Sequence, residues 1–156
     1  MIRTHVAQLN IARPLHPLDD PRMGKFMRNL DRVNAIAERT PGFVWRLKDE
    51  TNNATAFRPF GDPDMLVNMS VWETVEALER FVWATVHKHF YNRKGAWFER
   101  LATPHFVMWP IPAGHIPDLN EAKERLDHLI TNGDSDFAFG WSWLPHIQLW
   151  MSRQCG

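Results

Sequence analysis

Two histidines at the centre of a predicted helix are the side chains best suited to acid–base or iron chemistry. His87 and His89 are two residues apart. On a helix they would point about 160° away from each other, so they cannot share a metal ion. His87 lies at the margin of the helix's apolar stripe, where an imidazole could serve as a general acid or base, or as an axial ligand of haem iron. The alternative is one exposed histidine and one that is packed or hydrogen-bonded.

Uncharged polar side chains on two predicted strands form a second set. Gln8 and Asn10 alternate with apolar residues on the first strand, and Asn68 and Ser70 do so on a later one. Such groups on an apolar sheet must be paired, hydrated or bound to a ligand. They are suited to holding a substrate oxygen or stabilising an oxyanion. The alternative is that they form hydrogen bonds across a dimer interface. With His87, we expect these residues to be catalytic: Asn10, Asn68 and Ser70.

A third set consists of aromatic and basic residues that lie on or beside the predicted strands. They are expected to bind substrate or, alternatively, to be core packing and a solvated face. We expect three tryptophans to line the same cavity and a strand-end histidine to reach its mouth. Together with Gln8, this set comprises Trp45, Arg46, Trp72, His105 and Trp109.

The apolar patterns place these residues on an α+β fold. Residues 4–11 and 65–72 alternate with period two, as strands do, and residues 74–100 recur at helical spacing. Thr74 and Asp118 are predicted N-caps of helices. The element order is β-α-β-β-α-β, typical of ferredoxin-like folds, with an added C-terminal helix and an aromatic strand.

The two principal helices of this plan cover one face of the sheet. The other face has no helix assigned to it and therefore requires a partner. A second copy of the sheet would supply one, so we expect a homodimer that closes a barrel. The chain is predicted to be a single dimeric α/β-barrel domain over residues 1–156, with a core at 3–132 and an aromatic extension at 133–156.

Composition limits the partners. Eighteen basic residues balance eighteen acidic ones, which argues against nucleic acid or an anionic membrane surface as a partner. No apolar run approaches the roughly 20 residues of a membrane span. The single cysteine, Cys155, allows no internal disulfide, and a cytoplasmic location is expected. Eight tryptophans are either core or the walls of a pocket for an apolar or aromatic ligand.

Four segments carry a resemblance to a known family. AQLNIARP, PGFVWRLKDE, VNMSVWE and KGAWFER resemble domain-of-unknown-function family 3291 of the dimeric α/β-barrel superfamily, over roughly residues 6–132. The resemblance implies the fold and the homodimer, and it brings no established activity.

The arrangement is also distantly similar to antibiotic-biosynthesis and haem-degrading monooxygenases of that superfamily. In the haem-degrading group, an asparagine on the first strand and a histidine on the second main helix take part in haem binding. Asn10 and His87 occupy similar places here. The tryptophan of that helix has no clear equivalent, since Phe81, Val82 and Trp83 lie where it would fall. Despite this difference, haem is the one cofactor that the resemblance implies, and His87 would be its ligand.

Two functions follow as expectations. The first is a small-molecule enzyme, cofactor-free or haem-assisted, that oxidises, cyclises or isomerises an apolar or aromatic compound. In its cofactor-free form, a histidine removes a proton, asparagines hold the resulting anion, and the carbanion reacts with oxygen. The second is a non-catalytic dimeric protein that binds a small ligand.

Overall fold

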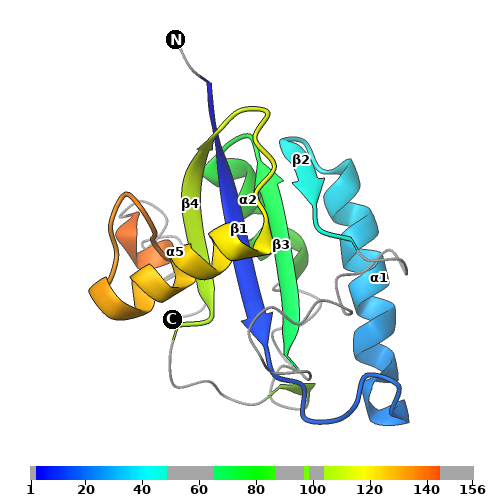
Figure 1. Ribbon diagram of the computed structural model, residues 1–156. Helices are drawn as coiled ribbons and strands as arrows, with labels where there is room; N and C mark the ends of the chain where they lie inside the picture. The colour runs from blue at the N-terminus through cyan, green and yellow to red at the C-terminus, as the bar shows by residue number, and fades with distance from the viewer. Residues whose placement is uncertain (1–2, 49–64, 87–96, 99–103, 145–156) are drawn as a thin grey trace.

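The computed structural model describes residues 3–48, 65–86, 97–98 and 104–144 (Figure 1). Its four strands form one antiparallel sheet in the order β2-β3-β1-β4. This order and the succession of elements confirm the predicted ferredoxin-like fold. The strands are β1 (Thr4–Ala12), β2 (Phe43–Arg46), β3 (Leu66–Trp72) and β4 (Phe106–Pro112).

The described helices follow the predicted periodicity. Each of the longer ones buries an apolar stripe, and none of them combines the length and apolar character that crossing a membrane requires. They are α1 (Gly24–Arg39), α2 (Val75–Phe81) and α5 (Leu119–Asn132), with short turns at Pro21–Met23 and Trp141–Trp143 and a π-helical segment at Val82–Val86.

The predicted caps are confirmed at two helix starts. The side chain of Thr74 accepts a hydrogen bond from the backbone N–H of Ala77 at 3.1 Å. Asp118 accepts one from the N–H of Glu121 at 2.8 Å. Each cap satisfies a backbone donor that the helix itself cannot pair, which explains why α2 and α5 begin there.

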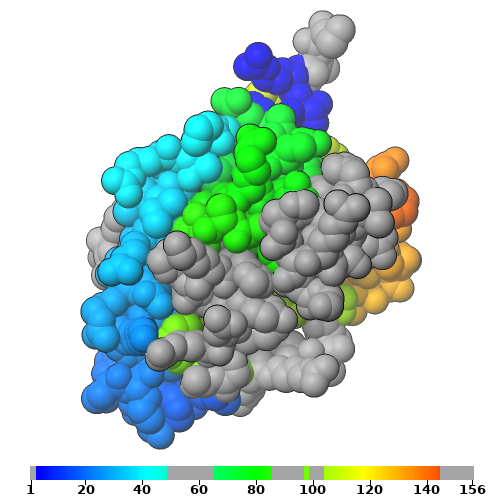
Figure 2. Space-filling model, turned by 180° about the vertical axis from the view of Figure 1, so that it is seen from behind, coloured from blue at the N-terminus to red at the C-terminus, as the bar shows by residue number. Residues whose placement is uncertain are grey.

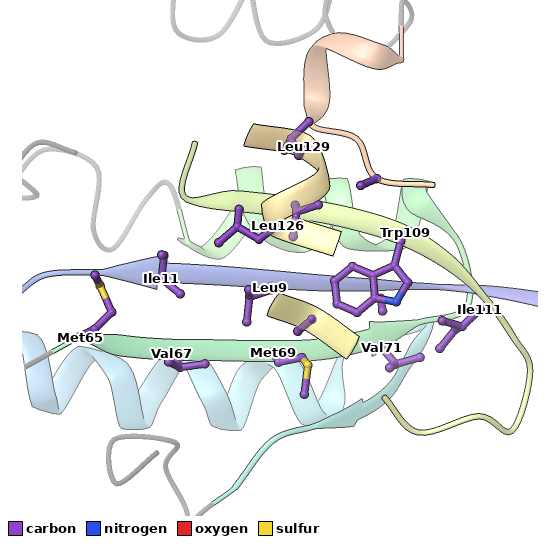
Figure 3. Close-up of a cluster of buried hydrophobic side chains, with 14 residues drawn as sticks. Leu9, Ile11, Met65, Val67, Met69, Val71, Trp109, Ile111, Leu126 and Leu129 are labelled. Carbon is purple, nitrogen blue, oxygen red and sulfur yellow. The ribbon is translucent and has the colours of Figure 1, made fainter. Parts of the chain in front are cut away.

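One face of the sheet, here called the α5 face, is packed against α5 (Figures 1 and 3). Leu126 and Leu129 of α5 belong to the same buried cluster as the strand residues. The expectation that this face carries no helix is therefore wrong: the apolar stripe of the third helix covers it within one chain. Its strand residues are Ala7, Leu9, Ile11, Val67, Met69, Val71, Val107, Trp109 and Ile111.

The opposite face, here called the α1/α2 face, lies beneath α1 and α2, whose outer surfaces are seen from behind in Figure 2. Trp72 and Met108 belong to its buried cluster, together with Ala37 of α1 and Leu78 of α2. Residues paired across antiparallel strands share a face, so this face also carries the predicted polar set.

The aromatic tail does not form the predicted fifth strand in its described part. Only Phe139 pairs with β4, through two backbone hydrogen bonds with Met108 of 2.7 and 2.9 Å. The chain then turns into a short 3-10 helix, where Trp141 stacks on Phe106 at 5.3 Å between ring centroids. Aromatic alternation here reflects packing of single rings against the sheet rather than a continuous ladder.

Candidate functional site

The predicted polar residues of β1 and β3 are joined in a hydrogen-bonded chain on the α1/α2 face. The indole Nε1 of Trp72 donates to Ser70 Oγ at 2.9 Å. Gln8 Nε2 donates to the same oxygen at 2.8 Å and to Asn68 Oδ1 at 2.8 Å. We call these four residues, Trp72, Ser70, Gln8 and Asn68, the polar relay.

The register of β1 and β3 builds the relay. Gln8 is the direct partner of Ser70, and Asn10 is the direct partner of Asn68. Side chains directly opposite in an antiparallel pair lie on one face with Cβ atoms about 4.5–5.5 Å apart. The sequence expectation that these residues meet on one face is thus met in the strands that carry them.

Exposure changes along the relay. Trp72 is 0% exposed, Gln8 5% and Ser70 7%, whereas Asn68 and Asn10 are exposed. Trp72 is held by aromatic neighbours, with Phe81 stacked at 5.0 Å and Phe43 edge-on at 5.5 Å between centroids. The relay therefore runs from a rigid, buried indole to two amides at the open end.

The open end is suited to binding oxygen. Asn68 Oδ1 is engaged by Gln8, so its Nδ2 donors remain for another acceptor. Asn10 adds a second amide beside it. Two adjacent amides beside apolar and aromatic packing can hold a carbonyl oxygen or a developing oxyanion.

The other two predicted tryptophans lie on the α5 face. Trp45 is paired with Val71, and Trp109 with Ala7, both residues of that face. Trp109 is fully buried and its Nε1 donates to Glu121 Oε2 at 2.8 Å. This corrects the expectation that Trp45, Trp72 and Trp109 share one cavity, because the sheet separates Trp72 from the other two.

Arg46 and His105 have different surroundings. Arg46 is 5% exposed and its Nε pairs with Glu38 Oε1 of α1 at 2.9 Å, so its charge is matched within the chain. His105 is exposed just before β4, and its backbone oxygen accepts from the N–H of Ile11 at 2.9 Å. Neither joins the relay through a direct hydrogen bond among the contacts of the described residues.

Haem ligation depends on a residue outside the described residues. His87 lies there, as does His89, so their predicted roles as base or iron ligand stay predictions. The relay itself offers amide, hydroxyl and indole groups, which are not axial ligands of haem iron. Within the described ranges, no group of three His, Cys, Asp or Glu could hold a metal ion.

Sequence reasoning missed the role of Glu121. Its two carboxylate oxygens bind Trp109 and His115, the second at 2.7 Å from His115 Nε2. Glu121 and His115 border a shallow groove of about 530 Å³ between the end of β4 and α5, whereas Trp109 lies buried beneath it. The available signal was the position of Glu121 three residues after the N-cap Asp118, where a carboxylate is favoured in the first turn of a helix.

Comparison with solved structures gives distant likenesses. SnoaB, a cofactor-independent oxygenase from Streptomyces nogalater, has a TM-score of 0.46 and 17% identity, covering 72% of this chain and 95% of that one. A conserved protein from Methanosarcina mazei has a TM-score of 0.48 and 8% identity, covering 70% and 92%. A candidate antibiotic biosynthesis monooxygenase from Chloroflexus aurantiacus has a TM-score of 0.43 and 11% identity, covering 73% and 97%. Likenesses of this size carry no argument about activity.

Sequence comparison gives the family. No curated protein matches the chain. The model of the family described as "Domain of unknown function (DUF3291)" matches residues 5–152, nearly the whole sequence. The resemblance of the four sequence segments is thereby confirmed, and this chain belongs to the DUF3291 family.

Proposed function

We propose that this chain is a small-molecule enzyme with a monooxygenase-like reaction, acting on an apolar, aromatic compound at the open end of the polar relay. The observation that carries the proposal is the pair of adjacent amides, Asn10 and Asn68, on the same sheet face as the buried aromatic cluster of Trp72. The amides supply donors to an oxygen, and the apolar surroundings suit the remainder of the compound.

The proposed reaction begins with removal of a proton from a carbon next to a carbonyl. The negative charge moves onto the oxygen, where Asn10 and Asn68 stabilise it. The carbanion then adds to dioxygen and takes up a proton to give a hydroperoxide, and loss of water leaves a new ketone. The balance is one CH₂ group and O₂ giving one C=O group and water, so the substrate supplies all the electrons. His87 is the predicted base. A cyclisation or isomerisation would begin with the same anion.

Oxygen uptake tests the proposal. A suitable probe is 2-tetralone, an aromatic ketone with an acidic CH₂ group. We expect uptake above the uncatalysed rate and formation of a product that has gained one oxygen. Asn68→Leu is expected to lower the rate by about 10²-fold, the usual effect of deleting one oxyanion donor. Asn120→Leu, the same substitution at an exposed position of α5, is the matched control and leaves the chemistry in place. Equal rates with and without protein would contradict the proposal.

A non-catalytic binder is the second candidate, and one observation favours it. The relay consists of uncharged side chains and contains no group that could take a proton near neutral pH. Binding of aromatic ketones, seen as quenching of tryptophan fluorescence, without oxygen uptake or product would support this candidate. A Soret band on adding haem, lost in His87→Ala, would instead support the haem-assisted form.

The homodimer belongs to this proposal as well. Its original premise, an uncovered sheet face, does not hold, because the α5 face is buried within one chain. The surface that remains for a second copy includes Ile116 and Ile130, which are 50% and 42% exposed beside and on α5. Light scattering at micromolar concentration should give twice the chain mass of 18.3 kDa, and a monomer mass would contradict the dimer.

A further inference from the structure

We infer that Gln8 is a positioning residue, which fixes the Asn68 amide with its N–H groups outward and so makes the site selective for ligands with a hydrogen-bond acceptor. The inference rests on the site proposed above. It adds a residue that acts without touching the ligand, and it predicts which kind of ligand atom faces Asn68.

The relay begins at a group that can only donate. An indole N–H has no acceptor function, and that of Trp72 is directed at Ser70 Oγ. Trp72 is completely buried and is packed between Phe81 and Phe43, so the indole has little freedom to turn away. One lone pair of the Ser70 oxygen is therefore permanently occupied.

Gln8 continues the relay from Ser70 to Asn68. Its Nε2 carries two hydrogens, and one is directed at Ser70 Oγ and the other at Asn68 Oδ1, both at 2.8 Å. The hydroxyl oxygen of Ser70 then accepts two hydrogen bonds, its full capacity. Gln8 is 5% exposed, so leaving its N–H donors without acceptors would cost free energy. The amide is therefore held in this orientation.

Asn68 is the end of the relay and the point where polarity matters. With Oδ1 held by Gln8, the side of the amide that remains is the NH₂ group, and Asn68 is exposed. A carbonyl, phenolate or enolate oxygen fits there. A ligand that presents only an N–H donor, with no acceptor atom, would face another donor. If the side-chain amides of Gln8 and Asn68 were both rotated by 180°, Asn68 would present Oδ1 instead and select donors. The two orientations therefore predict opposite ligands.

Two naphthalenes of matched shape test the polarity. 2-Acetylnaphthalene carries an acceptor oxygen, and 2-isopropylnaphthalene has a methyl group in its place. Their dissociation constants are measured by quenching of tryptophan fluorescence. We expect the wild-type chain to bind the ketone about 10-fold more tightly, the ratio that one hydrogen bond of ordinary strength gives.

Three variants locate the source of the preference. Gln8→Met has nearly the same shape but no amide, so Asn68 is no longer held, and the ratio should fall towards 1. Ser70→Ala removes the acceptor that orients Gln8 and should have the same effect. Asn68→Asp presents an oxygen in place of NH₂, and the ratio should fall below 1. Leu126→Ala on the α5 face destabilises the chain without touching the relay, and its ratio should equal that of the wild type.

The possible results are distinct. The positioning role of Gln8 would be overturned if the ratio of dissociation constants stayed near 10 in Gln8→Met and Ser70→Ala. A cooperative thermal denaturation curve must first show that both variants are folded. A wild-type preference for the isopropyl compound, or an acceptor preference kept in Asn68→Asp, would overturn the assigned polarity. Equal binding of the two probes with oxygen uptake intact would overturn this inference alone. No binding of either probe would overturn the proposed site and the inference with it.

Discussion

Gly42 and Ala77 touch where the loop before β2 passes α2: a Cβ atom added to Gly42 would lie 2.5 Å from the Cβ of Ala77. Gly42 has a φ of +92°, a backbone conformation that residues with a side chain rarely adopt. Its carbonyl oxygen also accepts the N–H of Glu73 at 2.7 Å, just before α2 begins. The close approach fixes α2 against the sheet, and Phe81 of α2 is the ring stacked on Trp72 of the relay.

We therefore expect Gly42→Ala to lower the free energy of unfolding by about 2 kcal/mol or more, because the strained backbone and the contact with α2 add together. Gly114→Ala is the matched control. Gly114 has almost the same φ, +93°, with nothing within 4 Å of an added Cβ, so only the backbone cost of about 1–2 kcal/mol should remain. Urea unfolding measures both. Equal losses in the two variants would show that the contact with Ala77 contributes nothing.

The strand patterns explain why part of the site was predictable. Period-two alternation places Gln8 with Asn10 on one face of β1 and Asn68 with Ser70 on one face of β3. These faces coincide because both strands turn their apolar residues to the same core. The connections of the relay depend on the register to the residue, which alternation does not specify. The indole of Trp72, which sequence reasoning treated as core or cavity wall, fixes the direction of the first hydrogen bond, to Ser70 Oγ.

Two features of the fold could not be predicted from the sequence, for physical reasons. Trp45 is two residues after Phe43, so simple alternation places both on one face. A β-bulge between them pairs Phe43 with Trp72 and Trp45 with Val71, which lie on opposite faces. Likewise, the apolar stripe of α5 predicts that one side of the helix is buried, but not which surface buries it.

The contact between Trp109 and Glu121 should contribute measurably to stability. Glu121→Ala leaves the indole N–H of a completely buried tryptophan without its acceptor, and we expect a loss of about 1–3 kcal/mol in the free energy of unfolding. Glu121→Gln keeps an oxygen acceptor and should lose less. Asp127→Ala removes the exposed pair with Lys123 on the same helix and should change stability by at most about 0.5 kcal/mol. A Glu121→Ala loss no larger than that of Asp127→Ala would contradict the prediction.

The free energy of unfolding should fall at low pH because Asp20, at the start of the segment leading into α1, becomes protonated. The side-chain hydrogen bond from Arg22, followed by the backbone N–H of Arg22, lowers the pKa of Asp20 from 3.8 to about 2. Because the carboxylate is favoured in the folded chain, its stabilising effect is complete above about pH 4 and is lost as the pH falls to about 2.

The matching variant is Asp20→Asn, which keeps a side-chain oxygen for capping but has no charge to titrate. Urea unfolding at several pH values should show a shallower decline between pH 4 and pH 2 in Asp20→Asn than in the wild type. Asp127→Asn, the same change at an exposed carboxylate that pairs with Lys123 one turn away, is the control for the substitution itself. Parallel curves for wild type and Asp20→Asn would exclude Asp20 as the source.

Arg46 was predicted to bind substrate, and in the folded chain it already binds the carboxylate of Glu38. Its side chain is 4% exposed, and Glu38 lies 2.9 Å from its Nε, with Lys48 3.8 Å from the other Glu38 oxygen. Glu38→Gln leaves a buried guanidinium with a neutral acceptor, and we expect the free energy of unfolding to fall by about 1–3 kcal/mol.

The same variant distinguishes a structural ion pair from a ligand site. Arg46 is the direct strand partner of Ser70, so a ligand carboxylate that reached it would lie beside the relay. If Glu38 normally satisfies Arg46, 2-naphthoate should raise the melting temperature of Glu38→Gln and leave that of the wild type unchanged. Glu124→Gln, which removes an acidic charge on α5, should behave like the wild type. Equal stabilisation of the wild type and Glu38→Gln would mean that Arg46 leaves Glu38 to bind ligand, in which case the substrate carries an acid as well as an aromatic ring.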